Sequence, residues 1–173
     1  DFTAGVANLT TLGLTYTGAS GTGTFTATAT GASGTSGSVT VTAGTATRLV
    51  ITGTGTQTAG TPQSLTITAK DGAGSTVASY TGDKTLTFSG ATASTSPVTA
   101  PTVSSTTGVA VAFGTATTIT FTNGVATVSG ANNGVLTLYR AEAATIAVTD
   151  GTISAAGADR LSVTVSAGAL TKL

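Results

Sequence analysis

The sequence contains no cysteine, methionine, tryptophan or histidine, and only 7% of its 173 residues are charged. Without cysteine, the chain has no disulfide framework and no thiolate nucleophile. Without histidine, it lacks the commonest general base and the commonest metal ligand of proteins. The lack of easily oxidised sulfur side chains fits an exposed, extracellular setting. We therefore expect that the chain is not an enzyme, has no catalytic residues and needs no cofactor.

Charge of either sign is scarce, because six basic and six acidic residues cancel. A neutral chain gains no affinity for nucleic acid from the release of counterions. The longest strictly apolar run, Val109–Phe113, is far too short to cross a bilayer as a helix. We predict neither nucleic-acid binding nor membrane insertion.

Threonine, alanine, serine, valine and 24 glycines supply most of the chain, and the apolar residues alternate with polar ones. This period of two predicts strands with one buried and one exposed face. Turn signals such as DGAG, TNG, ANNG and DG separate the alternating segments. The segment 138–147 is read as strand–turn–strand rather than helix, because its alternation continues. The predicted strands are 48–52, 64–70, 84–90, 118–122, 124–130, 135–140, 145–150 and 161–166.

Many short strands with frequent turns predict an all-β antiparallel sandwich. Residues 91–116 differ from the rest of the chain, because they carry Pro97 and Pro101 and few large side chains. We interpret residues 91–116 as an inserted loop.

Two short sequence segments each occur twice, and the copies follow one another in the same order. VTVTAGTATRL at 39–49 matches VTVSAGALTKL at 163–173, an offset of 124 residues (163 minus 39). FTAGVANL at 2–9 matches FTNGVATV at 121–128, an offset of 119 residues (121 minus 2). The offsets are near the ~100 residues of an Ig-like sandwich, which predicts Ig-like β-sandwich repeats in series.

This period divides the chain into three parts. Residues 1–44 are predicted to be the C-terminal strands of an incomplete Ig-like repeat, and residues 45–168 a complete one. Residues 169–173 are predicted to be the first strand of a following repeat or a donor strand. An incomplete sandwich exposes strand edges, and strand addition from a neighbouring copy would cover them. A cut through a longer array would give the same ends, so both interpretations stay open.

The stretch from AGTATRLVI to DKTLTFSG (43–90), with ITFTNGVATV (119–128) and ADRLSVTVSAGA (158–169), resembles the bacterial Ig-like tandem repeats of invasin/intimin-like adhesins. The resemblance implies an extracellular β-sandwich at the cell surface, strung in series as a stalk, spacer, fibre or adhesin. It also implies the absence of catalysis.

Two further kinds of site are candidates. Asp71 and Asp150 lie in turns and would each supply one ligand to calcium, a weak possibility because calcium takes six to eight oxygens. The preferred interpretation is that each carboxylate binds its own turn. Asn8 begins an N-x-[ST] triplet and is the glycosylation candidate; exposed Thr and Ser also suit O-linked sugars.

An isopeptide crosslink is a third possibility. It would join Lys84 to Asn132 or Asn133 with Glu142 as the catalytic carboxyl, although nothing in the spacing requires these residues to meet. Ordinary turn asparagines are the preferred interpretation.

The predicted function is structural: a subunit or segment of a cell-surface filament, stalk or layer built from Ig-like repeats, with strand donation as one route of assembly. The partners would be copies of the chain in a head-to-tail homopolymer, or neighbouring repeats of the same chain. The alternative is an adhesin or a carbohydrate-binding module that recognises glycans. Such binding sites usually present exposed aromatic side chains, and the tyrosines available are Tyr16, Tyr80 and Tyr139.

Overall fold

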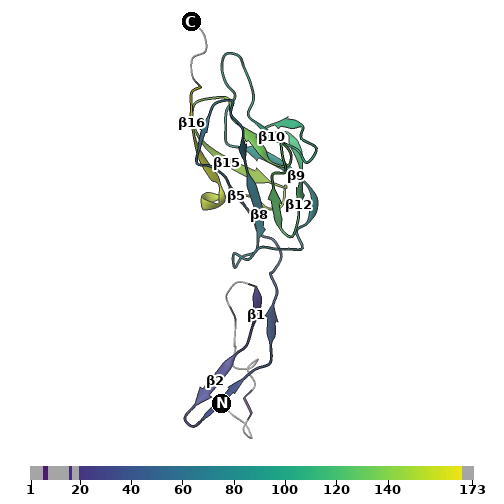
Figure 1. Ribbon diagram of the computed structural model, residues 1–173, viewed down its shortest axis with the longest axis vertical. Coiled ribbons are helices and arrows are strands. Elements are labelled where there is room, and N and C mark those ends of the chain that lie inside the picture. The colour runs from purple at the N-terminus through teal and green to yellow at the C-terminus, as the bar shows by residue number, and fades with distance from the viewer. Residues whose placement is uncertain (1–5, 8–15, 17–19, 169–173) are drawn as a thin grey trace. The chain divides into compact units, whose positions relative to one another are not determined.

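Figure 1 shows the chain as a computed structural model, which describes residues 6–7, 16 and 20–168. The chain divides into two compact units, Asp1–Thr42 (unit 1) and Ala43–Leu173 (unit 2). Among the described residues every regular element is a β-strand except the short 3₁₀ helix η1 (Gly157–Asp159). The prediction of an all-β chain with antiparallel sheets is therefore confirmed. No helix within the described positions combines the length and apolar character that a membrane span requires.

The described part of unit 1 contains one antiparallel hairpin, which we call the ribbon and define as residues 20–42. It is built from two consecutive strand pairs. The first joins β1 (Gly21–Gly23) to β4 (Val39–Val41), and the second joins β2 (Thr26–Ala29) to β3 (Ala32–Thr35). Threonine alternating with alanine or valine favours this extended backbone, because β-branched side chains suit a pleated surface.

A turn and a bulge shape the ribbon. Gly31 lies between β2 and β3 with a φ of 80°, a conformation that residues with a Cβ rarely adopt. Between the two strand pairs, residues 24–25 of one arm face residues 36–38 of the other, which makes a β-bulge. At the bulge the Phe25 amide donates to the Ser36 hydroxyl (2.8 Å), and the Ser36 amide donates to the Phe25 carbonyl (2.8 Å).

The strands of unit 2 are short and follow one another closely. They are β5 (Arg48–Thr52), β6 (Thr56–Thr58), β7 (Gln63–Ser64), β8 (Thr66–Lys70), β9 (Gly82–Ser89), β10 (Thr102–Ser104), β11 (Ala110–Ala112), β12 (Ala116–Phe121), β13 (Val125–Thr127), β14 (Val135–Thr137), β15 (Ala143–Thr149) and β16 (Leu161–Ser166).

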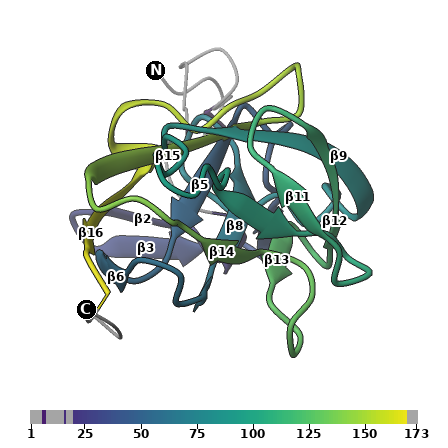
Figure 2. The same ribbon diagram turned by 90° about the horizontal axis from the view of Figure 1, so that it is seen from above.

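These strands form three sheets, with the orders β13-β8-β5, β12-β9-β15-β16-β6 and β11-β10-β14-β7. Between residues 48 and 166 all the pairings are antiparallel except that of β6 with β16, which is parallel. Figure 2 shows β9 and β15 along one side of this unit and β13 and β14 along the other. The first two strands, β5 and β6, belong to different sheets although only residues 53–55 separate them.

One hydrophobic core joins the three sheets. In β16 the side chains alternate strictly between buried and exposed, and β5, β8, β12 and β15 follow the same alternation. Burying each large apolar side chain contributes about 1.5–3 kcal/mol. The largest fully buried side chains are Phe88, Phe121, Leu49, Leu65, Ile67, Leu86, Ile119, Leu136, Leu138, Ile146, Val77 and Val103.

Each of the eight strands predicted from the alternation of apolar and polar residues overlaps an observed strand of unit 2. The predicted strands 48–52 and 161–166 coincide with β5 and β16, and the other six overlap β8, β9, β12, β13, β14 and β15. Residues 138–147 contain no helix and lead from β14 through bends into β15, as predicted. The turn asparagines Asn123 and Asn133 have positive φ values of 50° and 63°.

The segment 91–116, expected to be an inserted loop, differs from that expectation. It contains β10 and β11, which pair with each other, and β10 also pairs with β14. Val103 is fully buried in the core, and Ser104 beside it is buried as well. Pro101 precedes β10 and removes no hydrogen bond from its ladder, so a proline there is compatible with a strand.

Where the structure describes both copies of a repeated segment, the two copies lie in similar strand pairs. Residues 39–41 form β4, and residues 163–165 lie in β16. Each of these strands is the second arm of an antiparallel pair, β1–β4 in unit 1 and β15–β16 in unit 2. Residues 169–173, predicted as a following or donor strand, and most of 2–9 lie outside the described residues.

Candidate functional site

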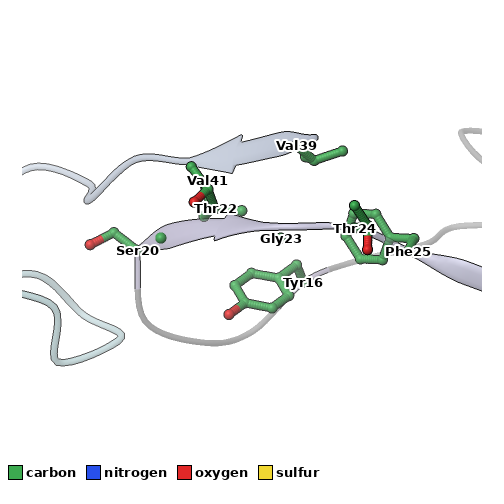
Figure 3. A pocket seen from close by; sticks show the side chains of 9 residues that line it. Tyr16, Ser20, Thr22, Gly23, Thr24, Phe25, Val39 and Val41 are labelled. Atoms are coloured by element: carbon green, nitrogen blue, oxygen red, sulfur yellow. The ribbon is translucent and has the colours of Figure 1, made fainter. Parts of the chain in front are cut away.

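The ribbon carries an open groove with a volume of about 300 Å³. Figure 3 shows Tyr16 alongside β1, with Phe25 and Val39 toward one end of the groove and Val41 toward the other. Its lining residues are Tyr16, Ser20, Gly21, Thr22, Gly23, Thr24, Phe25, Val39 and Val41.

The strand register explains the groove. Gly21 lies directly opposite Val41, and Gly23 lies opposite Val39, so these four residues share one face of the ribbon. A Cβ added at either glycine would meet nothing within 4 Å, which leaves the face hollow along β1. The groove therefore combines the apolar side chains of Tyr16, Phe25, Val39 and Val41 with the hydroxyl groups of Ser20, Thr22 and Thr24 and with exposed backbone at the two glycines.

The ribbon has no core of its own. None of the side chains at positions 20–42 is buried, and Tyr16, Phe25 and Val39 are 56%, 42% and 37% exposed. A two-stranded hairpin is at best marginally stable in water, so it gains most from a covering partner. Residues 20–42 contain no charged residue and no proline, which are the usual protections of an exposed strand edge. The ribbon is chemically suited to pair with another strand or to bind apolar side chains.

Unit 2 carries a second candidate, the Tyr80 cluster, made of Tyr80, Lys84 and Asp150. The Tyr80 hydroxyl donates to Asp150 Oδ2 at 2.7 Å, and Lys84 Nζ lies 4.9 Å from the centre of the Tyr80 ring. The ring of Phe121 meets Tyr80 edge to face, with 4.9 Å between the ring centres. Because Lys84 and Phe121 both contact the ring, little of it is free to stack on a sugar. The cluster fits a structural role better than glycan recognition.

The electrostatics of the Tyr80 cluster agree with that role. Burial, the hydrogen bond to Asp150 and the Asp150 charge all raise the pKa of Tyr80. Burial acts to raise the pKa of Asp150, but hydrogen bonds from the Ile153 amide, the Tyr80 hydroxyl and the Thr152 amide outweigh it and lower the pKa. The folded state therefore keeps Tyr80 protonated and Asp150 ionised, and neither is prepared to exchange a proton near neutral pH.

Asp71 binds its own turn, as the preferred sequence interpretation holds. Its Oδ1 accepts from the amides of Ala73 (3.0 Å) and Ser75 (2.8 Å), and its Oδ2 accepts from the Gly44 amide (3.0 Å). The bond from Gly44 is the largest cause of a lowered Asp71 pKa. Among the described residues, no three acidic side chains gather into a group that would hold a metal ion.

Asp71 and Asp150 predict a loss of stability in acid. Both have folded-state pKa values below the unfolded value of 3.8. Each carboxylate therefore stabilises the fold fully above the unfolded pKa, and this contribution is lost as the pH falls through the folded pKa. Urea unfolding between pH 7 and pH 2 is expected to show stability falling below about pH 4. The Asp71→Asn/Asp150→Asn variant should lose much of this pH dependence. An unchanged acid dependence in the variant would show that other groups cause it.

The structure does not bring together the residues of the proposed isopeptide crosslink. In the antiparallel register of β9 with β15, Val148 lies opposite Phe88, so Lys84 and Glu142 belong to opposite ends of this strand pair. Glu142 instead accepts from the Thr92 amide (2.8 Å) and hydroxyl (2.5 Å). The Asn133 side chain binds the main chain of Thr120 at both its amide and its carbonyl (2.7 and 2.9 Å).

A second hollow, of about 360 Å³, lies in unit 2 and is lined mainly by polar residues. Two of its lining hydroxyls, those of Thr106 and Thr120, are hydrogen-bonded to each other (2.7 Å), and the Thr120 hydroxyl donates to Asp83 Oδ1 (2.5 Å). Its lining has no aromatic side chain on which a sugar ring would stack. The lining residues are Thr106, Thr120, Thr122, Val125, Thr127, Ser129, Asn132 and Asn133.

Sequence reasoning located the turn aspartates but missed the groove. Asn8, the glycosylation candidate, lies outside the described residues. The signal that would have found the groove is the pair Gly21 and Gly23 facing Val41 and Val39 across a hairpin. This pairing can be recognised only when the strand register is known.

The comparisons with known proteins identify no family: no protein-family model, no curated protein and no solved structure matches the chain.

Proposed function

We propose that the chain is a structural, extracellular protein, a subunit or segment of a cell-surface filament, stalk or layer built from Ig-like sandwich repeats. In this proposal the ribbon is the contact through which one copy associates with another. The mode of contact is strand addition at a ribbon edge, with apolar side chains of the added segment lying in the groove. The proposal assigns no catalytic role.

The strand order of unit 2 supports an Ig-like repeat. One sheet contains β5, β8 and β13, another contains β12, β9, β15, β16 and β6, and side chains from both belong to one core. Strands from both of these sheets contribute to one core, as the two sheets of an Ig-like sandwich do, and a third sheet, β11-β10-β14-β7, is added to them. The scarcity of charge and the absence of cysteine and methionine support an extracellular setting.

The single observation that carries the assembly role is the uncovered ribbon. It exposes Phe25 and Val39 around the groove that Tyr16 also lines, and its strand edges have no charge to repel another strand. A contact between the ribbon of one copy and a different surface of the next is heterologous, and it extends into a filament when the rotation between copies does not close a ring.

We expect Val39→Lys to weaken the association of the full chain strongly. The substitution places an ammonium group on the groove face, where a covering strand would bury it without a partner. Self-association measured by sedimentation equilibrium should weaken by roughly 30-fold or more, because an unpaired buried charge costs several kcal/mol. Thr40→Lys is the matched control, because it adds the same charge to the neighbouring residue on the other face. It should change association by about threefold at most, as exposed charges do.

Two results would contradict the assembly role of the ribbon. One is a wild-type chain that stays monomeric at every concentration tested. The other is Val39→Lys associating as strongly as the wild type.

A further inference from the structure

Strand β11 forms an exposed edge of unit 2. It ends the sheet β11-β10-β14-β7, and among the described residues it pairs only with β10. Directly after β11, the Phe113 amide donates to the Pro101 carbonyl at 2.9 Å. Alternate residues of an antiparallel strand bond to the same neighbour, so Ala110 and Ala112 direct their main-chain groups away from β10. The Ala112 carbonyl accepts from the Thr115 amide at 3.1 Å, which leaves the Ala112 amide and both groups of Ala110 for a further strand.

The β11 edge is also apolar. Residues 109–113 are the longest strictly apolar run in the chain, and no charged residue occurs from position 85 to position 139. Val111 lies opposite Val103, which is fully buried, so the side chains on this face of β11 border the core. Val111 is only partly buried, and Val109 on the same face is 60% exposed. A strand added beside β11 would cover these side chains, and no charge or proline in the run opposes it.

The edges of β12 and β13 are closed by hydrogen bonds. In β12 the Thr118 carbonyl accepts from the Thr106 amide at 2.8 Å. The Asn133 side chain binds the main chain of Thr120 in β12, and its Nδ2 also donates to the Thr127 carbonyl in β13 at 3.1 Å. Asn133 therefore occupies the positions at which an added strand would bond to either of these edges.

The remaining edges of unit 2 offer less to an added strand. In β5 the Leu49 amide donates to the Ser154 carbonyl at 3.2 Å, and Ile51 is only 3% exposed. In β6 the Thr58 carbonyl accepts from the Thr61 amide at 2.9 Å, and both exposed side chains of this strand are threonines. Within the described part of unit 2, β11 is therefore the edge that combines unbonded main-chain groups with exposed apolar side chains.

We propose that β11 is the acceptor surface for the ribbon, so that strand β4 of one copy adds beside β11 of the next. The side chains of residues 109–113 then lie in the groove of the ribbon, and the ribbon covers the exposed margin of the neighbouring core. This inference rests on the proposed function, because it names the second surface of the contact between copies.

Strand β4 is the edge of the ribbon that fits β11. Among the described residues β4 pairs only with β1, and Figure 3 shows Tyr16 beside β1, on the side away from β4. In β4, Val39 and Val41 flank a threonine. At the other edge, Val109 and Val111 flank an alanine. When the two strands lie side by side, the valines of both can share one face and form cross-strand apolar pairs.

The two surfaces are also compatible in charge. Positions 2–47 and 85–139 contain no charged residue, so all twelve charged residues of the chain (six plus six) lie outside both segments. The contact between these strands therefore buries no ion and avoids the cost of removing a charge from water. It joins a two-stranded and a four-stranded sheet into one sheet of six strands (two plus four). A two-stranded hairpin is marginally stable alone, so the ribbon gains most from this addition.

Ala110→Pro closes the β11 edge without removing a bond to β10. The Ala110 amide points away from β10, so proline is compatible with unit 2, and its ring occupies the place of an incoming strand. Sedimentation equilibrium on the full chain should show association weakened by at least about tenfold, because a bond is lost and the approach is blocked. Association as strong as that of the wild type would overturn the proposal.

Ala110→Thr is the matched control, because it keeps the amide and suits an extended strand. It should change association by about threefold at most. Thermal unfolding followed by circular dichroism should show both variants at position 110 melting within a few degrees of the wild type.

Mixing two defective chains tests whether the two surfaces meet each other. Val39→Lys alters the ribbon and keeps β11, whereas Ala110→Pro alters β11 and keeps the ribbon. Each variant alone is expected to stay largely monomeric at concentrations where the wild type associates. An equimolar mixture should form pairs of one chain of each kind and nothing larger, because one intact ribbon and one intact β11 edge remain. A mixture that stays monomeric would overturn the pairing of the ribbon with β11.

Hydrogen exchange on the unaltered chain is a second measurement, and it does not depend on the folding of a proline variant. Association should slow exchange at the Ala110 amide by at least about tenfold, because a bond to β4 protects it. The Val111 amide, which faces β10, should be protected in dilute and concentrated solution alike. Mass spectrometry with fragmentation to single residues distinguishes the two amides. Unchanged exchange at Ala110 in the associated chain would overturn the proposal.

The outcomes separate the acceptor surface from the assembly role of the ribbon. If the wild type associates and Val39→Lys prevents this while Ala110→Pro does not, the ribbon keeps its assembly role and β11 is not its acceptor. If the wild type stays monomeric at every concentration, both fail.

Discussion

Replacing Gly90 with alanine is expected to prevent unit 2 from folding. Gly90 follows β9 with a φ of 99°, and a Cβ there would lie 1.9 Å from the Thr145 carbonyl oxygen. The Gly90 carbonyl accepts from the Thr145 amide at 3.2 Å, so the two backbones cannot separate without breaking the contact between β9 and β15. A clash with backbone together with a strained φ costs more than about 4 kcal/mol, a large part of the stability of an ordinary domain.

Thermal unfolding followed by circular dichroism checks the Gly90 prediction. The matched control is Gly72→Ala, because a Cβ at Gly72 meets nothing within 4 Å and its φ is not positive. The control should change stability by about 0.5 kcal/mol or less. A Gly90→Ala variant that melts within a few degrees of the wild type would show that β9 and β15 do not approach as described.

Phe121→Ala is the second large expected effect, a loss of about 3–5 kcal/mol in the free energy of unfolding. Phe121 ends β12, is 1% exposed and packs edge to face on Tyr80. Removing the Phe121 side chain would leave a cavity and would also remove the edge-to-face contact with the Tyr80 ring. Tyr80 in turn contacts Lys84 through its ring and Asp150 through its hydroxyl.

Phe25→Ala is the control for Phe121, since it removes the same side chain from the ribbon. Phe25 is 42% exposed and belongs to unit 1, which has no buried side chain among residues 20–42. Urea denaturation should show no change in the unfolding of unit 2 for Phe25→Ala. Equal losses for the two variants would mean that Phe121 is not in the core.

The strands of unit 2 were predictable wherever alternation ran over five residues or more. In β5 (RLVIT) and β16 (LSVTVS) each inward position is Leu, Ile or Val, so the pattern matches the boundaries. Strand β10 (TVS) has one large apolar residue, Val103, and no sequence pattern distinguishes it from a loop.

Several features of the fold depend on long-range pairing, which the sequence does not display. Gln57 stands between two threonines, and a local reading treats this stretch as polar and exposed. It is buried because β6 pairs with β16, more than 100 residues later in the chain, at Thr164–Ser166. The groove also depends on strand pairing. Gly21 and Gly23 help to form it only because the register places them opposite Val41 and Val39.

Electron microscopy of the concentrated wild-type chain tests the central proposal most directly. If copies associate through the ribbon of one and a different surface of the next, images will show filaments whose repeating unit is one chain, and Val39→Lys will show none. Separate particles with the mass of a single chain at every concentration would contradict the proposal.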